Sequence, residues 1–179
     1  VPGVPRRRFR PAVSAALCVL TLAAAAALGR PEARADGALA SLVGRAAPPI
    51  RARPLDSDEE LGLDRYRGRV VLLAFVATWC AACRRIAPEL DALATRHRER
   101  GLEVLALSHE PRARIRGHVA ARPRRHPVLQ CTGRTAVRYG ADALPTLVLV
   151  DRQGVVRAAH QGASGEVVAR LRASLESLL

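Results

Sequence analysis

Residues 73–83 read LAFVATWCAAC, an apolar run that ends in two cysteines separated by two alanines. A stretch that favours a helix follows, so we expect a strand that delivers a dithiol to the first turn of a helix. Cysteines three positions apart at a helix start are close enough to form a disulfide. Cys80 would lie among backbone N–H groups that have no helical partner and favour negative charge. Because the thiolate is the reactive form of cysteine, this position makes Cys80 a nucleophile at neutral pH.

Two other interpretations of the Cys80–Cys83 pair are a structural disulfide and half of a zinc site. A zinc site needs a second pair of ligands, and no His or Cys pair recurs in the sequence at finger-like spacing. We therefore favour a redox dithiol. We expect no bound metal and no organic cofactor, because the two cysteines carry the electrons themselves.

The N-terminal residues 1–35 have the pattern of an export signal. Arginines at positions 6–8 and 10 precede an uncharged run over residues 11–29, and Ala33-Arg34-Ala35 forms an A-x-A cleavage site. The uncharged run is also long enough to span a bilayer as a retained anchor. We favour the cleaved signal, and we expect an extracytoplasmic protein of the periplasm or cell envelope. If the segment is retained instead, this N-terminal anchor would be the only contact of the protein with the membrane.

The rest of the chain is interpreted as a linker over residues 36–45 and one domain over residues 46–179. Strands and helices alternate along that domain until a terminal hairpin and a last helix. Expected strands are 50–55, 70–76, 103–108, 128–130, 146–150 and 155–160, and expected helices are 80–100, 111–121, 132–139 and one that begins after Ser164. This order predicts an α/β fold whose mixed sheet is parallel in the middle and covered by helices on both faces. Reactive groups in such sheets lie at the carboxyl ends of strands, where Cys80 is expected.

The net charge is +13, and every basic side chain other than histidine is an arginine. The densest basic stretch is 112–126. It is interpreted either as a solvated helix face with a loop or as a docking patch for an anionic partner or lipid head groups. No aromatic platform accompanies these arginines, so we do not expect nucleic acid as a partner.

Several motifs together resemble one known family. They are Val71 to Cys83 with Pro88, Val104 to Ser108, Tyr139-Gly140, Leu144-Pro145-Thr146, and Asp151 with Gly154. In this combination they resemble the TlpA/ResA group of thioredoxin-fold proteins, from about Gly44 to the C-terminus. The resemblance implies a thioredoxin-like fold with an inserted helix and strand between residues 112 and 130. It also implies an extracytoplasmic thiol–disulfide oxidoreductase.

The same resemblance assigns roles to site residues. Cys80 would be the exposed attacking thiol and Cys83 the buried resolving one. Pro145 would be a cis-proline that faces the dithiol. Substrate docking would involve Trp79 together with Leu144, Pro145 and Thr146, where the backbone of Leu144 could pair with an extended partner strand. The alternative for Trp79 is packing in the core.

The sequence departs from the family pattern at three positions. Ala74 and Ile86 stand where the fold commonly carries a buried acid that moves the proton of the resolving cysteine. We therefore expect a high pKa for Cys83, because desolvation without a nearby base disfavours the thiolate. Cys131 stands where the family often has an aspartate. It is interpreted as a small core residue, a third redox thiol or a cysteine that forms an intermolecular disulfide.

The expected reaction is dithiol–disulfide exchange, in which a monomer reduces a protein disulfide and is reset by a membrane thiol–disulfide electron donor. The resemblance suggests substrates in cytochrome c maturation or at metal-site cysteines. A thiol peroxidase is one rival, but Thr78 precedes Cys80 by two residues rather than the three of the peroxidase pattern. A copper metallochaperone is another, but that class has three residues between its cysteines, whereas Cys80 and Cys83 have two. It also uses a distant histidine, for which His109 and His160 are candidates. A non-enzymatic docking module is the third.

Overall fold

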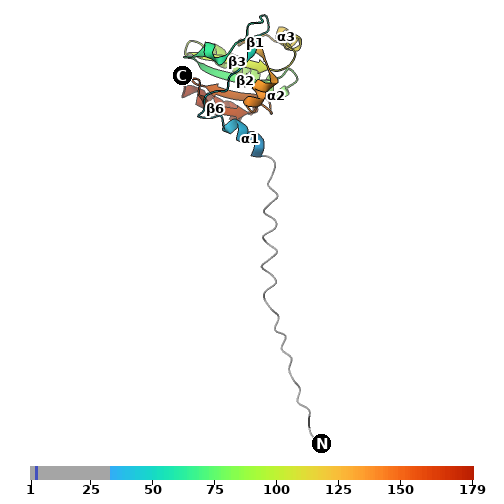
Figure 1. The fold of residues 1–179 in the computed structure, drawn as a ribbon, viewed down its shortest axis with the longest axis vertical. Coiled ribbons are helices and arrows are strands. Elements are labelled where there is room, and N and C mark those ends of the chain that lie inside the picture. Colours follow the sequence, from blue (N-terminus) through green and yellow to red (C-terminus); the bar gives the residue numbers. More distant parts are fainter. Residues whose placement is uncertain (1–2, 4–32) are drawn as a thin grey trace. The chain divides into compact units, whose positions relative to one another are not determined.

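The computed structural model describes Gly3 and residues 33–179, so the expected signal at 1–35 lies almost wholly outside the described part of the chain. Six strands form one mixed sheet in the order β1-β4-β3-β2-β5-β6 (Figure 1). Its strands are β1 (Ala52–Pro54), β2 (Val70–Phe75), β3 (Leu102–Ser108), β4 (Val128–Cys131), β5 (Thr146–Val150) and β6 (Val156–Gln161). The helices are α1 (Ala33–Ala40), η1 (Leu63–Tyr66), α2 (Ala81–His97), α3 (Arg112–Ala121), α4 (Gly133–Arg138) and α5 (Gly165–Glu176).

The pairing of the strands confirms the expected α/β class. Strand β3 runs parallel to both β2 and β4, whereas β5 and β6 form the antiparallel C-terminal hairpin beside β2. The short strand β1 lies at the sheet edge and pairs antiparallel with β4. The helix and strand expected between residues 112 and 130 are present as α3 and β4.

Strand β2 is the centre of the core, and all six of its residues are buried. Successive side chains of a strand point to opposite faces of the sheet, so β2 contributes to two hydrophobic clusters. One cluster includes Val71, Leu73, Phe75 and the buried Tyr139, and the other includes Val70, Leu72, Ala74 and buried side chains of α2 and α5. Helices therefore cover both faces of the sheet. Strand β2 ends at Phe75, shortly before the two cysteines in the chain.

Residues 36–45 were expected to form a linker, and this expectation is wrong. Helix α1 covers half of them, and the side chain of Leu39 is buried in the same cluster as Phe75. Gly140 has a φ of +59°, and a Cβ there would lie only 3.2 Å from the backbone nitrogen of Leu39. Because this segment packs against the core, the folded domain begins before residue 46. Four of these ten residues are alanine or glycine, and the helical spacing of Leu39, Leu42 and Val43 spans little more than one turn, which is too short to identify a helix in sequence. No helix within the described residues is long and apolar enough to cross a membrane.

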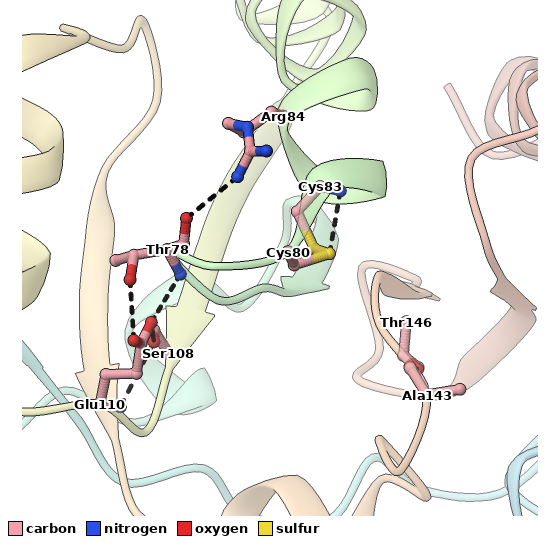
Figure 2. Close-up of a disulfide and its surroundings, with 8 residues drawn as sticks. All are labelled: Thr78, Cys80, Cys83, Arg84, Ser108, Glu110, Ala143 and Thr146. Carbon is pink, nitrogen blue, oxygen red and sulfur yellow. Dashed lines mark hydrogen bonds between the residues drawn. A yellow bond between two sulfur atoms is a disulfide. The ribbon is translucent and has the colours of Figure 1, made fainter.

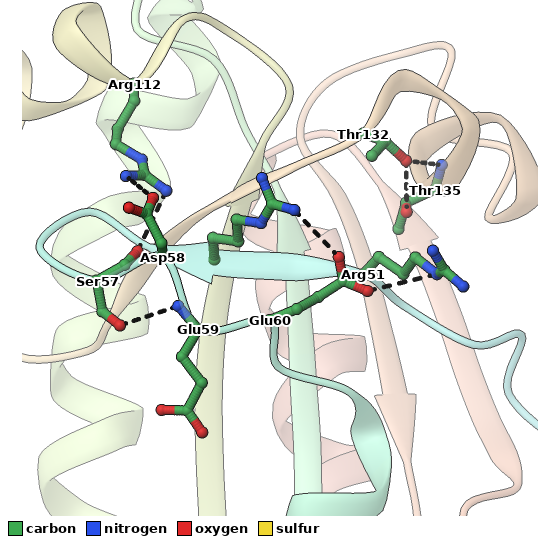
Figure 3. Close-up of polar contacts among 9 residues, drawn as sticks. Arg51, Ser57, Asp58, Glu59, Glu60, Arg112, Thr132 and Thr135 are labelled. Atoms are coloured by element: carbon green, nitrogen blue, oxygen red, sulfur yellow. Dashed lines mark hydrogen bonds and ion pairs between the residues drawn. The ribbon is translucent and has the colours of Figure 1, made fainter.

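The basic stretch makes mostly internal contacts. Arg112 donates to the carboxylate of Asp58 at 2.8 Å and to the carbonyl oxygen of Ser57 at 3.1 Å, which ties the start of α3 to the acidic segment 56–60 (Figure 3). Arg116 donates to the carbonyl oxygen of Leu55 at 2.6 Å. Arg114 and Arg124 form ion pairs with Glu110 and Asp91. These contacts favour the interpretation as a helix face and loop over a dedicated docking patch.

Candidate active site

Cys80 follows the carboxyl end of β2 and is the N-cap residue of α2. Its sulfur accepts a hydrogen bond from the backbone N–H of Cys83 at 3.0 Å, and the two residues form a disulfide with Cα atoms 5.2 Å apart (Figure 2). The expectation of a strand that delivers a dithiol to a helix start is confirmed. The same N–H groups would stabilise a Cys80 thiolate after reduction of the disulfide.

The expected exposure of Cys80 is wrong for this disulfide form, because Cys80 and Cys83 are each only 5% exposed. Ala77 is buried in the same small cluster, and Val76, Ala82 and Leu144 pack against it. Leu144 comes from a distant part of the chain, so this cover could not be predicted from the local sequence. The neighbours Trp79 and Ala81 are both exposed. Cys80 therefore lies directly beneath the surface, while the expected burial of Cys83 is confirmed.

Trp79 is 68% exposed, so the alternative that it packs in the core is wrong. The peptide bond between Leu144 and Pro145 is cis, as expected, and Leu144 packs against the dithiol cluster. Thr146 is fully buried, and its hydroxyl donates to the carbonyl oxygen of Ala143 at 2.6 Å. Its side chain thus holds this turn and is not available to a docked partner. Trp79 and Leu144 remain the side chains best placed to contact one.

The two positions that commonly carry a buried acid are apolar core positions here. Ala74 is fully buried, and Ile86 is 2% exposed in the same cluster. A buried carboxylate lies elsewhere in this region, that of Glu110, which is 6% exposed. It accepts hydrogen bonds from the backbone N–H of Thr78 at 2.6 Å and from the Thr78 hydroxyl at 2.8 Å. The hydroxyl of Ser108 donates to it at 3.2 Å.

Glu110 therefore anchors the loop that carries Trp79 and Cys80. In the view of Figure 2, Thr78, Ser108 and Glu110 lie on one side of the disulfide, and Thr146 lies on the other. Burial alone would raise the pKa of Glu110, but the hydrogen bonds from Thr78 and Ser108 outweigh burial and hold that pKa below its ordinary value.

Glu110 is not among the site residues expected from the sequence. One available signal was its position, because it follows β3 by two residues and β3 is the parallel neighbour of β2. Side chains that follow neighbouring parallel strands meet at one edge of the sheet.

Cys131 lies at the end of β4, opposite Ala52 of β1, and is 6% exposed. Burial raises the pKa of its thiol to about 11. A buried thiol with a raised pKa is unreactive, so the structure favours the interpretation as a core residue. In the part of the chain that the structure describes, no group of three or more His, Cys, Asp or Glu side chains is placed to hold a metal ion.

A family model described as the AhpC/TSA family matches residues 43–159. The chain belongs to the AhpC/TSA family. Within it, the chain is similar to thiol-disulfide oxidoreductase ResA of Bacillus thuringiensis subsp. konkukian, with 29% identity over 116 residues. That match covers 64% of this chain and 66% of the relative, which is slightly less than two thirds of its length. ResA of Geobacillus thermodenitrificans is 32% identical over 117 residues, which cover 64% of this chain and 67% of the relative.

Solved structures agree with a thioredoxin-like fold. A Chlorobium tepidum protein described as thiol:disulfide interchange protein DsbE superposes with a TM-score of 0.69 and 25% identity, over 74% of this chain and 94% of that one. A second thiol:disulfide interchange protein from Chlorobium tepidum TLS has a TM-score of 0.63 over the same shares of the two chains, and at 18% identity it shows the fold alone. The chain is thus a ResA-like member of the AhpC/TSA family with a thioredoxin-like fold, which confirms the resemblance stated from its motifs.

Proposed function

We propose that this protein is an extracytoplasmic thiol–disulfide oxidoreductase that reduces disulfides in partner proteins. The observation that carries the proposal is the Cys80–Cys83 disulfide at the junction of β2 and α2, with the Cys80 sulfur as the N-cap acceptor. The ResA relatives, which are named thiol-disulfide oxidoreductases, support the same activity.

In the proposed mechanism, the reduced protein reacts through Cys80. Its thiolate attacks one sulfur of the partner disulfide, that bond breaks, and a mixed disulfide forms as one partner thiolate leaves. The thiolate of Cys83 then attacks the Cys80 sulfur. The bond from Cys80 to the partner breaks, the second partner thiolate leaves, and the Cys80–Cys83 disulfide forms. The partner gains two electrons, and the dithiol loses them.

Export, direction and reset are further parts of the proposal. The signal-like pattern of residues 1–35 supports a location outside the cytoplasm. The resemblance to ResA supports the reductase direction and substrates in cytochrome c maturation or at metal-site cysteines. It also supports a monomer whose Cys80–Cys83 disulfide is reduced again by a membrane thiol–disulfide donor. Exposed Trp79 beside the dithiol offers an apolar surface on which a partner protein would dock.

Trapping tests the activity and the two cysteine roles together. A Cys83→Ser variant is expected to hold a protein disulfide substrate such as insulin as a mixed disulfide that dithiothreitol releases, and a Cys80→Ser variant is expected to form none. Cys131→Ala is the matched control, and it should keep the activity of the unmodified protein. Disulfide reduction that persists in Cys80→Ser would overturn the proposal. Consumption of hydrogen peroxide at a higher rate than insulin reduction would instead support the peroxidase rival.

A further inference from the structure

A cavity of about 50 Å³ lies beside Cys83, between α2, α3 and the end of β3. Polar lining residues are Thr78, Ser108, Arg84, His118, Arg124 and His126, and apolar side chains complete the walls. None of the lining residues is acidic. Most of the cavity wall is apolar, but the six polar side chains offer the two to four hydrogen-bond partners that a buried water needs. The volume is also sufficient, since a site of one water needs only about 10–15 Å³ by this measure.

The resolving thiol needs a proton acceptor, because only the thiolate of Cys83 attacks the mixed disulfide. The apolar residues Ala74 and Ile86 cannot take the proton. Glu110 is a poor acceptor because its carboxylate already receives three hydrogen bonds from Thr78 and Ser108. Any acceptor that Cys83 reaches through the cavity is therefore a histidine.

The two cavity histidines differ in their partners. His126 pairs through Nδ1 with Asp91 at 2.9 Å, and Asp91 follows Cys83 by eight residues on α2. Eight residues correspond to about 12 Å along a helix. His118 lies on α3 and lines the same cavity as Cys83 and Arg84, and among the described residues it forms no ion pair with a carboxylate. His118 is thus the histidine that we assign to the proton of Cys83.

We propose that His118 accepts the proton of Cys83 through water in this cavity and passes it to solvent. The inference rests on the proposed function, since it concerns the second step of the exchange. The Cys83 S–H bond breaks, the proton moves by way of water to the free ring nitrogen of His118, and the thiolate then displaces the partner thiolate from Cys80. The imidazolium releases the proton to bulk water, because His118 is only half-buried and borders both the cavity and solvent.

The electrostatic surroundings suit a base. Burial lowers the pKa of His118, as do the charges of Arg122, Arg124 and Arg84, whereas Glu110 raises it. The net direction is downward from the ordinary value of 6.5, so the ring is neutral and able to accept a proton at neutral pH. A general base that touches the reacting group raises the reaction rate by about 10²- to 10⁴-fold, and we expect an increase at or below the low end of that range when water lies between them.

The test is stopped-flow release of thionitrobenzoate when the reduced protein meets Ellman's reagent. The first phase reports formation of the mixed disulfide at Cys80. The second phase reports its resolution, and its loss in Cys83→Ser identifies it. In His118→Gln we expect the second phase at pH 7 to slow at least tenfold while the first phase stays within twofold. His126→Gln is the matched control from the same cavity and should stay within twofold in both phases.

The pH profile separates proton transfer from a structural effect. In the unmodified protein, the second phase should be level above about pH 6.5 and should fall as His118 becomes protonated at lower pH. In His118→Gln it should instead rise about tenfold per pH unit above pH 7, following direct loss of the Cys83 proton. An unchanged profile in His118→Gln, or equal slowing in His126→Gln, would overturn the inference. Absence of the first phase in the unmodified protein would overturn the proposed function instead.

Discussion

Replacement of Glu110 by glutamine tests whether this buried carboxylate holds the active-site loop. The substitution keeps the shape of the side chain but removes the charge that accepts two hydrogen bonds from Thr78, at 2.6 and 2.8 Å. A hydrogen bond to a charged group contributes about 1.5–3 kcal/mol, and the amide can still accept one of the two. We therefore expect Glu110→Gln to lower the free energy of unfolding at pH 7 by about 2 kcal/mol.

Urea unfolding of the disulfide form at several pH values is the assay. The pKa of Glu110 lies below its ordinary value of 4.5, so the stabilisation from its charge is fully present above pH 4.5 and is lost as pH falls through the lower folded pKa. The difference between the two proteins should therefore shrink below pH 4.5. The control is Glu99→Gln, which changes an exposed carboxylate that forms no ion pair among the described residues. A loss under about 0.5 kcal/mol at pH 7, or a loss that does not depend on pH, would refute the anchoring role.

Three shorter predictions concern the surface and the core. Trp79→Ala should raise the KM for a protein disulfide about fivefold, which corresponds to a loss of about 1 kcal/mol of docking energy, and should leave the melting temperature unchanged. The control Val137→Ala, at a site that is 79% exposed, should change neither the KM nor the melting temperature. Cys131 should resist iodoacetamide in the native protein at pH 8 and react after unfolding, as mass spectrometry would show, because its pKa is about 11; rapid native labelling would contradict its burial. Leu39→Ala should lower the free energy of unfolding by about 2–4 kcal/mol, and an effect no larger than that of the more exposed Val43→Ala would mean that α1 is not part of the folded domain.

Local pattern was enough to predict most of the fold. The apolar run before Cys80 predicts a buried central strand, and β2 is buried at all of its positions. Ser164 precedes an amphipathic segment, and its hydroxyl accepts from the N–H of Val167 at the start of α5. In each case the signal lies within a few residues of the element that it identifies, so the chain need not be folded to recognise it.

Contacts between distant residues account for what the sequence did not reveal. The burial of Cys80 depends on Leu144, and the role of Glu110 depends on Thr78, which is 32 residues away. His118 has no distinguishing neighbour in sequence, since its significance comes only from the cavity that it shares with Cys83. The apolar residues Ala74 and Ile86 show that the usual proton acceptor for Cys83 is absent from those positions, but only the folded chain indicates His118 as a candidate to replace it.

The proposed roles of Glu110 and His118 predict a measurable coupling between them. One buried carboxylate commonly serves this fold, whereas here Glu110 holds the loop and the proton is assigned to His118. Although burial and three arginines lower the pKa of His118, the charge of Glu110 raises it. Removal of that charge in Glu110→Gln should therefore shift the acid limb of the resolution phase to lower pH.

In a His118→Gln background the same Glu110→Gln change should leave the pH dependence of resolution unaltered, because the group that responds to the charge is gone. Stopped-flow profiles of the two single variants and the double variant complete the cycle. A shift of equal size in both backgrounds would mean that Glu110 acts on Cys83 directly. The proton of the resolving thiol would then depend on a carboxylate after all, but one that follows β3 and not one at the positions of Ala74 and Ile86.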